Sequence, residues 1–412
     1  MKYILMRLKE VQDPGQLGKI KHVLSDILAM CIISIMCGAK STHQIHMFVQ
    51  CREEWFRRFL EMPNGVPNRL TINRVLSLIQ PKKFCVIFTQ IMQQIQRLSK
   101  DAIVSLDGKS CFSKGEQGPL YMVSAWCNEN SSILGQVQSD MKSNEITAIP
   151  ELLALLDIEG LTVTIDAIGC QKAIVERIVT KNKADYVIGL KGNQGNMHRN
   201  LSLYAEDCLA DPHMRDKYTH VRTLDKGHGR IEKRDYYLFS DVSWFPERKD
   251  WKKLNSVVMV KSRREVISQE PSYETRYYIS SLTDVEKASK AIRSHWGIEN
   301  KLHWTLDVLM SEDDWMTKIA TIAANLATIR KLALNFLRKA KQEDGEKLSG
   351  PMLMYRCGLN LPSLEQVLFG QPLDQMLSWL LFTPVLAERV KNIFKYPKKP
   401  KGVFVFITNK QI

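Results

Sequence analysis

Two apolar runs that each end in an aspartate constrain the fold of this chain more than any other feature. Residues 102–107 read Ala-Ile-Val-Ser-Leu-Asp, and residues 161–166 read Leu-Thr-Val-Thr-Ile-Asp. Short apolar runs of this kind, bounded by turn residues, are typical of buried strands. In open sheets with alternating strands and helices, functional sites lie at the carboxyl ends of the strands. Asp107 and Asp166 are therefore candidates for such a site.

The neighbouring segments predict an α/β domain, in which helices pack on a mixed sheet. Three consecutive strands followed by alternating helix and strand give this architecture. Strands are predicted at 102–107, 121–127, 133–138, 161–166 and 185–190, and helices at 147–156 and 171–180. Further strands at 236–239, 256–260 and 276–280 indicate a β-rich insertion over about 215–282. The domain then closes with helices up to about residue 340.

Residues 1–100 predict a separate helical domain, because apolar residues recur there with helical period, over 23–39 and 84–98. The breaker at 63–67 precedes a helix over 68–79 that carries Arg69 and Arg74. A turn followed by such a helix resembles half of a DNA-binding helix-turn-helix, although a solvated amphipathic helix is the commoner use of this pattern. Residues 341–412 are predicted to be a divergent basic tail.

The net charge of +14 favours acidic partners, with nucleic acid first and an anionic membrane second. The longest apolar run, 27–39, is shorter than the roughly 20 residues of a membrane-spanning helix. The basic residues are also dispersed, so no membrane partner is expected. Nine cysteines without a Cys-x-x-Cys pair, and no secretory signal, indicate reduced thiols and a cytoplasmic protein.

A third acid, Glu299, lies in a predicted helix, where His295, Glu299, His303 and Asp307 recur every four residues. The two histidines are about 12 Å apart along such a helix, which is too far to share one zinc ion. A Mg²⁺-binding carboxylate flanked by phosphate-contacting histidines fits the spacing better. The alternative is the rim of a helix that buries its tryptophans.

Three loops add candidate phosphate contacts. Lys109 follows Asp107 after one glycine, and the backbone of 190–195 could receive an anion as a strand turns into a helix. Residues 226–234 gather basic side chains around His228 and two glycines, as a DNA-contacting loop or an exposed hairpin would. None of these loops has the spacing of an ATP-binding loop.

Six motifs taken in order resemble one family. They are Asp-Gly-Lys at 107–109, the run 142–150, Thr-Ile-Asp-Ala at 164–167, Leu-Lys-Gly-Asn-Gln-Gly at 190–195, His-Gly-Arg-Ile-Glu at 228–232 and Arg-Ser-His-Trp-Gly-Ile-Glu-Asn at 293–300. Together they resemble the H-repeat-associated proteins, which are bacterial insertion-sequence transposases of the DDE type with a ribonuclease-H-like core. The likeness covers roughly residues 10–342, including the helical domain that accompanies the family's catalytic part.

The resemblance implies that Asp107, Asp166 and Glu299 are the catalytic, metal-binding triad. It further implies two Mg²⁺ ions, for which Mn²⁺ could substitute, and double-stranded DNA as substrate, both at element ends and as target. The reaction would be strand cleavage and strand transfer by in-line phosphoryl transfer. A homodimer is one assembly compatible with such an enzyme. The predicted DNA contacts are Lys109, Lys191, Asn193, His228, Arg230, Arg293, His295, Trp296 and Lys301.

The sequence departs from the family pattern at two places. Many related transposases carry Tyr-x2-Arg-x3-Glu-x6-Lys around the glutamate, whereas this chain has Ile292, His295, Glu299 and Leu306 at those positions. The segment after Gln342 also differs from the usual ending. A catalytically degenerate DNA-binding remnant of an insertion element and a stand-alone DNA nuclease are therefore alternative functions.

Overall fold

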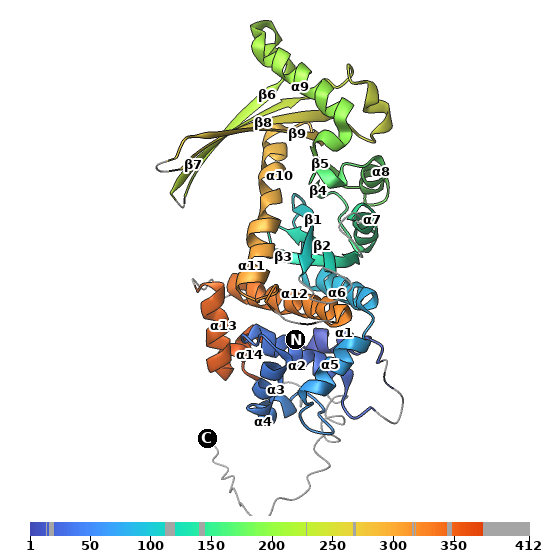
Figure 1. Ribbon diagram of the computed structural model, residues 1–412, viewed down its shortest axis with the longest axis vertical. Coiled ribbons are helices and arrows are strands. Elements are labelled where there is room, and N and C mark those ends of the chain that lie inside the picture. The colour runs from blue at the N-terminus through green and yellow to red at the C-terminus, as the bar shows by residue number, and fades with distance from the viewer. Residues whose placement is uncertain are drawn as a thin grey trace, which may run out of the picture.

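The computed structural model describes residues 1–13, 15, 20–111, 120–139, 145–227, 229–266, 269–314, 317, 319–343 and 348–373. The molecule is elongated (Figure 1), with the N-terminal helices at one end and a curved wing of long strands at the other. The first five strands and their helices lie between these ends. His228 falls outside the described residues.

Nine strands form one mixed sheet in the order β3-β2-β1-β4-β5-β9-β8-β7-β6. The pairs β1–β4 and β4–β5 are parallel, and every other pair is antiparallel. The strands are β1 Ile103–Cys111, β2 Leu120–Cys127, β3 Ser132–Ser139, β4 Thr162–Ile165, β5 Asp185–Leu190, β6 Thr219–Gly227, β7 Arg230–Phe239, β8 Ser256–Val266 and β9 Ser272–Ser280. The prediction of a mixed α/β fold is thus confirmed.

The β-rich segment continues the central sheet, because β9 pairs with β5 in a register that sets Val187 opposite Ser280. The strands β6 to β9 reach beyond the helices as the wing in Figure 1. Side chains alternate between the two faces of each strand, and the outer half of the wing is largely exposed. The wing therefore presents polar and charged side chains on both faces.

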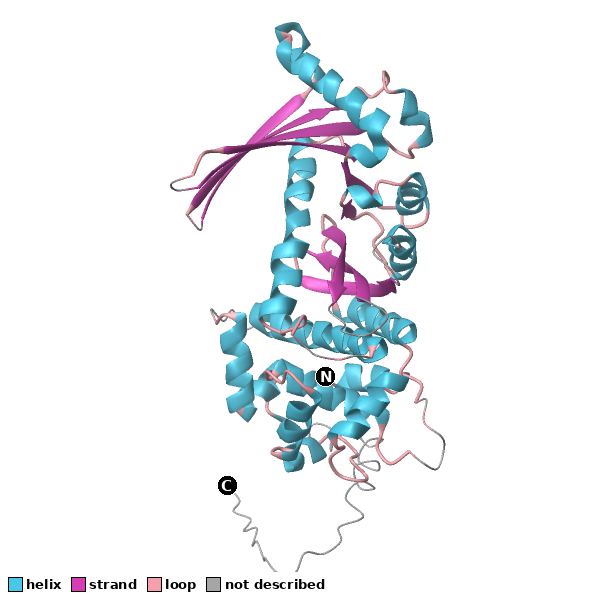
Figure 2. Ribbon diagram, viewed as in Figure 1, coloured by secondary structure: helices cyan, strands magenta, loops and turns pink. Residues whose placement is uncertain are grey.

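Helices cover both faces of the sheet (Figure 2). On one face lie α7 Glu145–Leu155, α8 Lys172–Thr180 and α9 Gly195–Ala210, whose apolar side chains share a core with the strands. On the other lies α10 Val285–Gly297, where Ala288, Ala291 and Ile292 pack against Ile103 and Val187. The two alanines allow α10 to approach the sheet closely, which brings its carboxyl end beside β1.

The remaining helices form one body with its own apolar core. They are α1 Lys2–Leu8, α2 Leu24–Met36, α3 Thr42–Gln50, α4 Glu53–Arg57, α5 Arg69–Leu78, α6 Pro81–Ile95, α12 Ala320–Glu343, α13 Gly350–Leu359 and α14 Leu361–Phe369. Every residue of α2 is buried, which explains its uninterrupted apolar sequence. Helix α12 contacts α2, α5 and α6 and also β2 and β3, so it joins the helical body to the sheet.

The segment after Gln342 begins with α13 and α14, which pack onto the N-terminal helices. The Trp55 indole donates to Glu365 at 2.8 Å, and the Met1 amino group donates to the Leu368 carbonyl at 2.9 Å. The predicted tail over 341–412 therefore contributes two helices to the helical body, while residues 374–412 lie outside the described part.

Among the described helices, no single one has the length and apolarity to cross a bilayer. Helices α5 and α6 reach that length and apolarity only when they are taken together, and the chain bends by 90° between them. All nine cysteines are free thiols, and seven of them are buried. The prediction that they serve mostly as reduced core residues is confirmed.

Candidate active site

Asp107 and Asp166 lie on the neighbouring parallel strands β1 and β4 or directly after them. The prediction that Asp107 ends its strand is wrong, because β1 continues to Cys111 in pairing with β2. Asp166 does follow the last residue of β4, where its carboxylate accepts from the Ile168 N–H at 3.0 Å and caps a short 3₁₀ turn. Since Leu106 is in register with Ile165, both aspartates occupy the same level of the sheet.

Glu299 lies in a π-helical turn, Ile298–His303, between α10 and α11 Trp304–Val308. Single π turns inserted in α-helices occur often at functional sites, because the extra residue in the turn changes the direction of the side chains around it. Here Ile298 and Leu302 are buried in the helical core, whereas Glu299 is exposed on another side of the turn. Apolar packing of the turn therefore fixes where the glutamate lies.

The three acids are electrostatic neighbours. The pKa of Asp107 is raised to about 8, first by burial and then by the negative charges of Asp166 and Glu299. The Gly108 N–H, which donates to the Asp107 carboxylate at 2.9 Å, only partly offsets this rise. The structure thus brings together the three acids that the sequence singled out.

A fourth carboxylate, Glu145 at the start of α7, lies beside this site and contributes to the raised pKa of Asp107. Its side chain fills the space over Gly108, where an added Cβ would lie 2.4 Å from a Glu145 oxygen. Glycine at 108 therefore leaves room for a buried carboxylate beside Asp107. Sequence reasoning did not give Glu145 a site role, because only the fold brings α7 against β1.

The acidic and basic groups around Asp107 indicate whether a cation could be held there. Among the described residues no three His, Cys, Asp or Glu side chains are gathered as tightly as the ligands of one bound ion. Of the basic groups in the described parts of the chain, His303 alone is paired with Asp107, with Nδ1 3.6 Å from a carboxylate oxygen. Burial lowers the pKa of His303 to about 3, so this imidazole does not offset the negative charge of the neighbouring acids. A hard divalent cation held by oxygen ligands fits that excess of negative charge.

His295 joins α10 to β4 and β1 through a buried chain of hydrogen bonds. The Thr164 hydroxyl donates to Ser105 Oγ at 3.0 Å and lies 3.1 Å from His295 Nδ1. Asn128 donates to the same Ser105 oxygen at 3.1 Å and accepts from the Trp126 indole at 3.1 Å. This chain fixes the end of α10 immediately before the turn that carries Glu299.

His295 and His303 both face the strands: His295 lies against Thr164 of β4, and His303 lies near Asp107 of β1. Burial lowers the pKa of His295 to about 4, and its Nδ1 already has a partner in Thr164. His303 is neutral for the same reason. The two imidazoles therefore pack against the strands of the site, and the DNA contact of His295 stays a prediction.

Lys109 is enclosed by carboxylates. Its ammonium lies 2.6 Å from Asp307 and donates to Glu312 at 3.0 Å and to Asp313 at 3.1 Å. Burial alone would lower the Lys109 pKa, yet the charge of these acids, Glu312 foremost, raises it above its ordinary value. Lys109 thus ties β1 to the segment after α11, in place of the free phosphate contact that the sequence suggested.

The loop after β5 supports Asp166. Asn193 donates to the Ala167 carbonyl at 2.6 Å, and Gln194 donates to the Cys170 carbonyl at 3.0 Å. Gly189 lets the two segments approach, since a Cβ there would lie 3.1 Å from the Ala167 nitrogen. Asn193 therefore holds the turn that begins at Asp166, while the Lys191 side chain is exposed.

The other predicted DNA contacts lie on α10, its π turn and the wing. Arg293 donates to Asp225 of β6 at 3.2 Å, and the Arg276 guanidinium lies 4.8 Å from the centre of the Trp296 ring. Arg230 lies at the start of β7, 3.4 Å from Glu232, and Lys301 is exposed on the π turn. The exposed side chains of Arg293 and Lys301 flank Glu299 in sequence.

The two apolar replacements in the family signature have a structural explanation. Ile292 is 5% exposed and packs between α10 and the sheet, and Leu306 is fully buried in the helical core. A tyrosine or a lysine at these positions would have to enter an apolar core. Only the glutamate of that signature therefore lies at the site.

The chain matches two family models. Residues 5–92 match a DDE transposase-associated domain, and residues 98–336 match the transposase DDE domain. Since the second match covers more than half of the sequence, the chain belongs to the family of transposases with a DDE domain, and such membership implies a DNA substrate.

The relatives agree with this family. The chain is 40% identical over 354 residues to "Putative transposase YncI" of Escherichia coli O157:H7, with 83% of this chain and 89% of the relative covered. It is 35% identical over 354 residues to "H repeat-associated putative transposase YhhI" of Escherichia coli strain K12, with 83% and 92% covered. The resemblance found in the sequence motifs is confirmed.

Proposed function

We propose that this protein is a metal-dependent DNA transposase that cleaves DNA at the ends of an insertion element and joins the freed 3′ ends to target DNA. Asp107, Asp166 and Glu299 would be its catalytic residues. The observation that carries the proposal is that Asp107 on β1 and Asp166 directly after β4 lie at the same level of neighbouring parallel strands, with Glu299 near enough for its charge to raise the pKa of Asp107. Within the part of the chain that the structure describes, none of the three acids is paired with a lysine or an arginine, and such carboxylates are the ligands that a hard divalent cation prefers.

The strand order supports a ribonuclease-H-like core within the larger sheet. Three antiparallel strands, β3-β2-β1, are followed by the parallel strands β4 and β5, with α7 before β4 and α8 between β4 and β5. The proposal is supported by the position of Asp107 on β1, of Asp166 directly after β4 and of Glu299 in the π turn after α10. We propose that the wing of β6 to β9 is an insertion into this core.

Two Mg²⁺ ions, or Mn²⁺ in their place, would supply activation of the attacking hydroxyl and stabilisation of the leaving oxygen in an in-line displacement. Asp107, Asp166 and Glu299 would hold them. The protein's own tasks are then positional: Asn193 fixes the turn at Asp166, and the bonds of His295 fix the helix end before Glu299. Asp107 must release its proton before it can ligate a cation, which ties cation binding to pH.

Lys191, Arg293 and Lys301, together with Arg230 of the wing, are proposed to contact the DNA backbone, and Trp296 of α10 is proposed as a further DNA contact. Positive side chains with access to solvent suit the phosphates of a duplex, which supply most of the affinity in protein–DNA complexes. A dimer that engages two element ends fits the same proposal.

The test is a cleavage and joining assay with duplexes taken from the inverted repeats that flank the coding region. Wild-type protein with Mg²⁺ or Mn²⁺ is expected to give cut ends and joined products. Asp107→Asn, Asp166→Asn and Glu299→Gln should each lose activity by about a thousandfold, since metal stabilisation supplies several kcal/mol. Asp101→Asn is the matched control, because its side chain is 82% exposed just before β1.

Three other outcomes would contradict the proposal. Cut ends without joined products would identify a stand-alone nuclease, and DNA binding without cleavage would identify a degenerate remnant. Full activity in Asp107→Asn would remove Asp107 from the catalytic set.

A further inference from the structure

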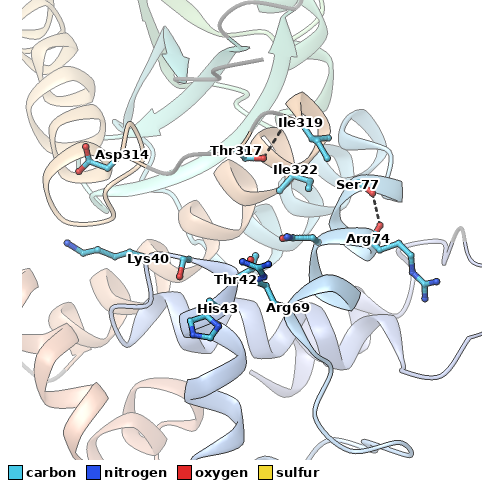
Figure 3. A pocket seen from close by; sticks show the side chains of 12 residues that line it. Lys40, Thr42, His43, Arg69, Arg74, Ser77, Asp314, Thr317, Ile319 and Ile322 are labelled. Carbon is cyan, nitrogen blue, oxygen red and sulfur yellow. Dashed lines mark hydrogen bonds between the residues drawn. The ribbon is translucent and has the colours of Figure 1, made fainter. Parts of the chain in front are cut away.

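A pocket of about 570 Å³ opens where α3, α5 and the segment leading into α12 meet. Figure 3 shows this pocket between the helical body and the end of the sheet domain. It is lined by Lys40, Ser41, Thr42, His43, Arg69, Asn73, Arg74, Ser77, Asp314, Thr317, Ile319 and Ile322.

The lining is positively charged. Lys40, Arg69 and Arg74 contribute three cations and His43 an imidazole, against the single carboxylate of Asp314. All four basic side chains are exposed, and none forms an ion pair within the part of the chain that the structure describes. Their charge is therefore available to an anion from solution.

The cations are spread across the pocket. Figure 3 shows Lys40 and Arg74 at opposite sides of the view, with His43 and Arg69 between them. A small anion is best held by donors that converge on one point, whereas a row of cations suits a chain of phosphates. The arrangement favours a polyanion.

The amino ends of two helices add to the positive electrostatic potential of the pocket. Thr42 begins α3 and Arg69 begins α5, and both residues line the pocket. Neither helix has an acidic residue in its first turn, so the partial positive charge of each amino end is not neutralised there. Two helix ends and four basic side chains thus act in the same direction.

The pocket is connected to the candidate active site by a short stretch of chain. Asp314 directly follows Glu312 and Asp313, which hold Lys109. Lys109 in turn lies two residues after Asp107 on β1. The lining of the pocket thus includes the residue that follows the two acids paired with Lys109 of β1.

We propose that this pocket binds the phosphate backbone of a DNA strand, as a second contact region that places the duplex relative to the carboxylates. The proposal rests on the proposed function, because it takes DNA as the substrate. It assigns Arg69 as the central contact, Lys40 and Arg74 as flanking contacts, and His43 as a hydrogen-bond donor. Contact with phosphates alone makes this binding independent of base sequence.

The test measures binding of a fluorescent duplex by anisotropy over a series of salt concentrations, with full-length protein. Arg69→Ala is expected to reduce the slope of log affinity against log salt by about 0.9, the value for one phosphate contact. It should weaken binding by a similar factor on specific and unrelated duplexes, and Arg69→Lys should restore most of the slope. Lys83→Ala is the control, because Lys83 is an exposed cation on α6 outside the pocket.

Unchanged affinity and slope in Arg69→Ala, or an equal loss in Lys83→Ala, would overturn the inference. So would saturable binding of inorganic phosphate or a mononucleotide that depends on Arg69 while duplex binding does not, because the pocket would then serve a small anion. Asp107→Asn separates the two proposals: it should abolish cleavage and keep the wild-type salt slope. If wild type cleaves and Arg69→Ala binds DNA normally, this inference fails and the proposed function stands.

Discussion

At the scale of single residues, Asp107 is the residue on which the proposed cation site depends most. The predicted role of Asp107 followed from its place at the end of an apolar run, but the raised pKa of its carboxyl group could not be predicted from that position. The pKa of about 8 depends on burial and on Asp166 and Glu299, which are 59 and 192 residues away in sequence. For the same reason the sequence could not show that Lys109 is enclosed by acids or that His295 is neutral. Residue types and spacing were predictable, whereas burial and long-range partners were not.

The raised pKa predicts how the stability of the metal-free protein varies with pH. Because the folded Asp107 binds its proton more tightly than an unfolded aspartate of pKa 3.8, the contribution of this group to stability is lost as pH rises from about 4 to about 8. Asp107→Asn removes this dependence. Its Tm in chelator should exceed that of wild type by a margin that widens up to pH 8 and is small at pH 5, as followed by thermal melts.

Asp101→Asn serves as the comparison for these melts, since this exposed residue should leave the wild-type pH dependence intact. Parallel curves for wild type and Asp107→Asn would show that the Asp107 carboxyl is not perturbed.

At the scale of elements, the helix from 285 to 308 shows what periodicity can and cannot predict. The four-residue recurrence of polar groups correctly predicted one face, which lies against β1 and β4. The π turn at Ile298–His303 was not predictable, because it results from packing of Ile298 and Leu302 into a core built from distant helices. The strands of the centre were predicted well, since apolar runs are a local property. Strand β6 was missed and β7 to β9 are longer than predicted, because the outer parts of these strands are mostly polar and partly or largely exposed. The end of β1 was missed because its pairing with β2 continues past the apolar residues.

Because α10 lies close to the sheet at Gly297, we expect this position not to tolerate a larger residue. A Cβ on Gly297 would lie 2.0 Å from the Asn128 side-chain oxygen, so Gly297→Ala must displace the amide that bonds Ser105. We expect a loss of about 1–3 kcal/mol in the free energy of unfolding, as for other overpacked sites. Cleavage activity should fall by more than this destabilisation explains, since the turn that follows carries Glu299. Denaturant melts and the cleavage assay measure the two effects.

Gly195→Ala is the matched control, because the added Cβ at the start of α9 meets no atom within 4 Å. Equal behaviour of the two alanine variants would mean that α10 does not need this close contact.

At the scale of the whole molecule, the helical body is assembled from both ends of the chain. The helical character of residues 1–100 was predicted, because its apolar periodicity is local. The contribution of α13 and α14 was missed, since proline- and glycine-containing sequence after residue 342 gave no strong pattern and its burial depends on the N-terminal helices. The single continuous sheet was missed similarly, because only the β5–β9 pairing joins the wing to the centre.

Packing of α14 predicts a large effect of one substitution far from the active site. Leu364 is fully buried, so Leu364→Ala should cost about 2–5 kcal/mol in the free energy of unfolding. Leu359→Ala, at the 68% exposed end of α13, should cost far less. Similar melting curves for both variants would contradict the placement of these helices in the core.

The most direct test of the central claim, that Asp107, Asp166 and Glu299 form one cation site, is titration of the protein with Mn²⁺ by electron paramagnetic resonance above pH 8, where Asp107 is ionised. We predict saturable Mn²⁺ binding to wild type and to Asp101→Asn, and at least about tenfold weaker binding to Asp107→Asn, Asp166→Asn and Glu299→Gln alike. Wild-type Mn²⁺ affinity in all three triad variants would contradict it.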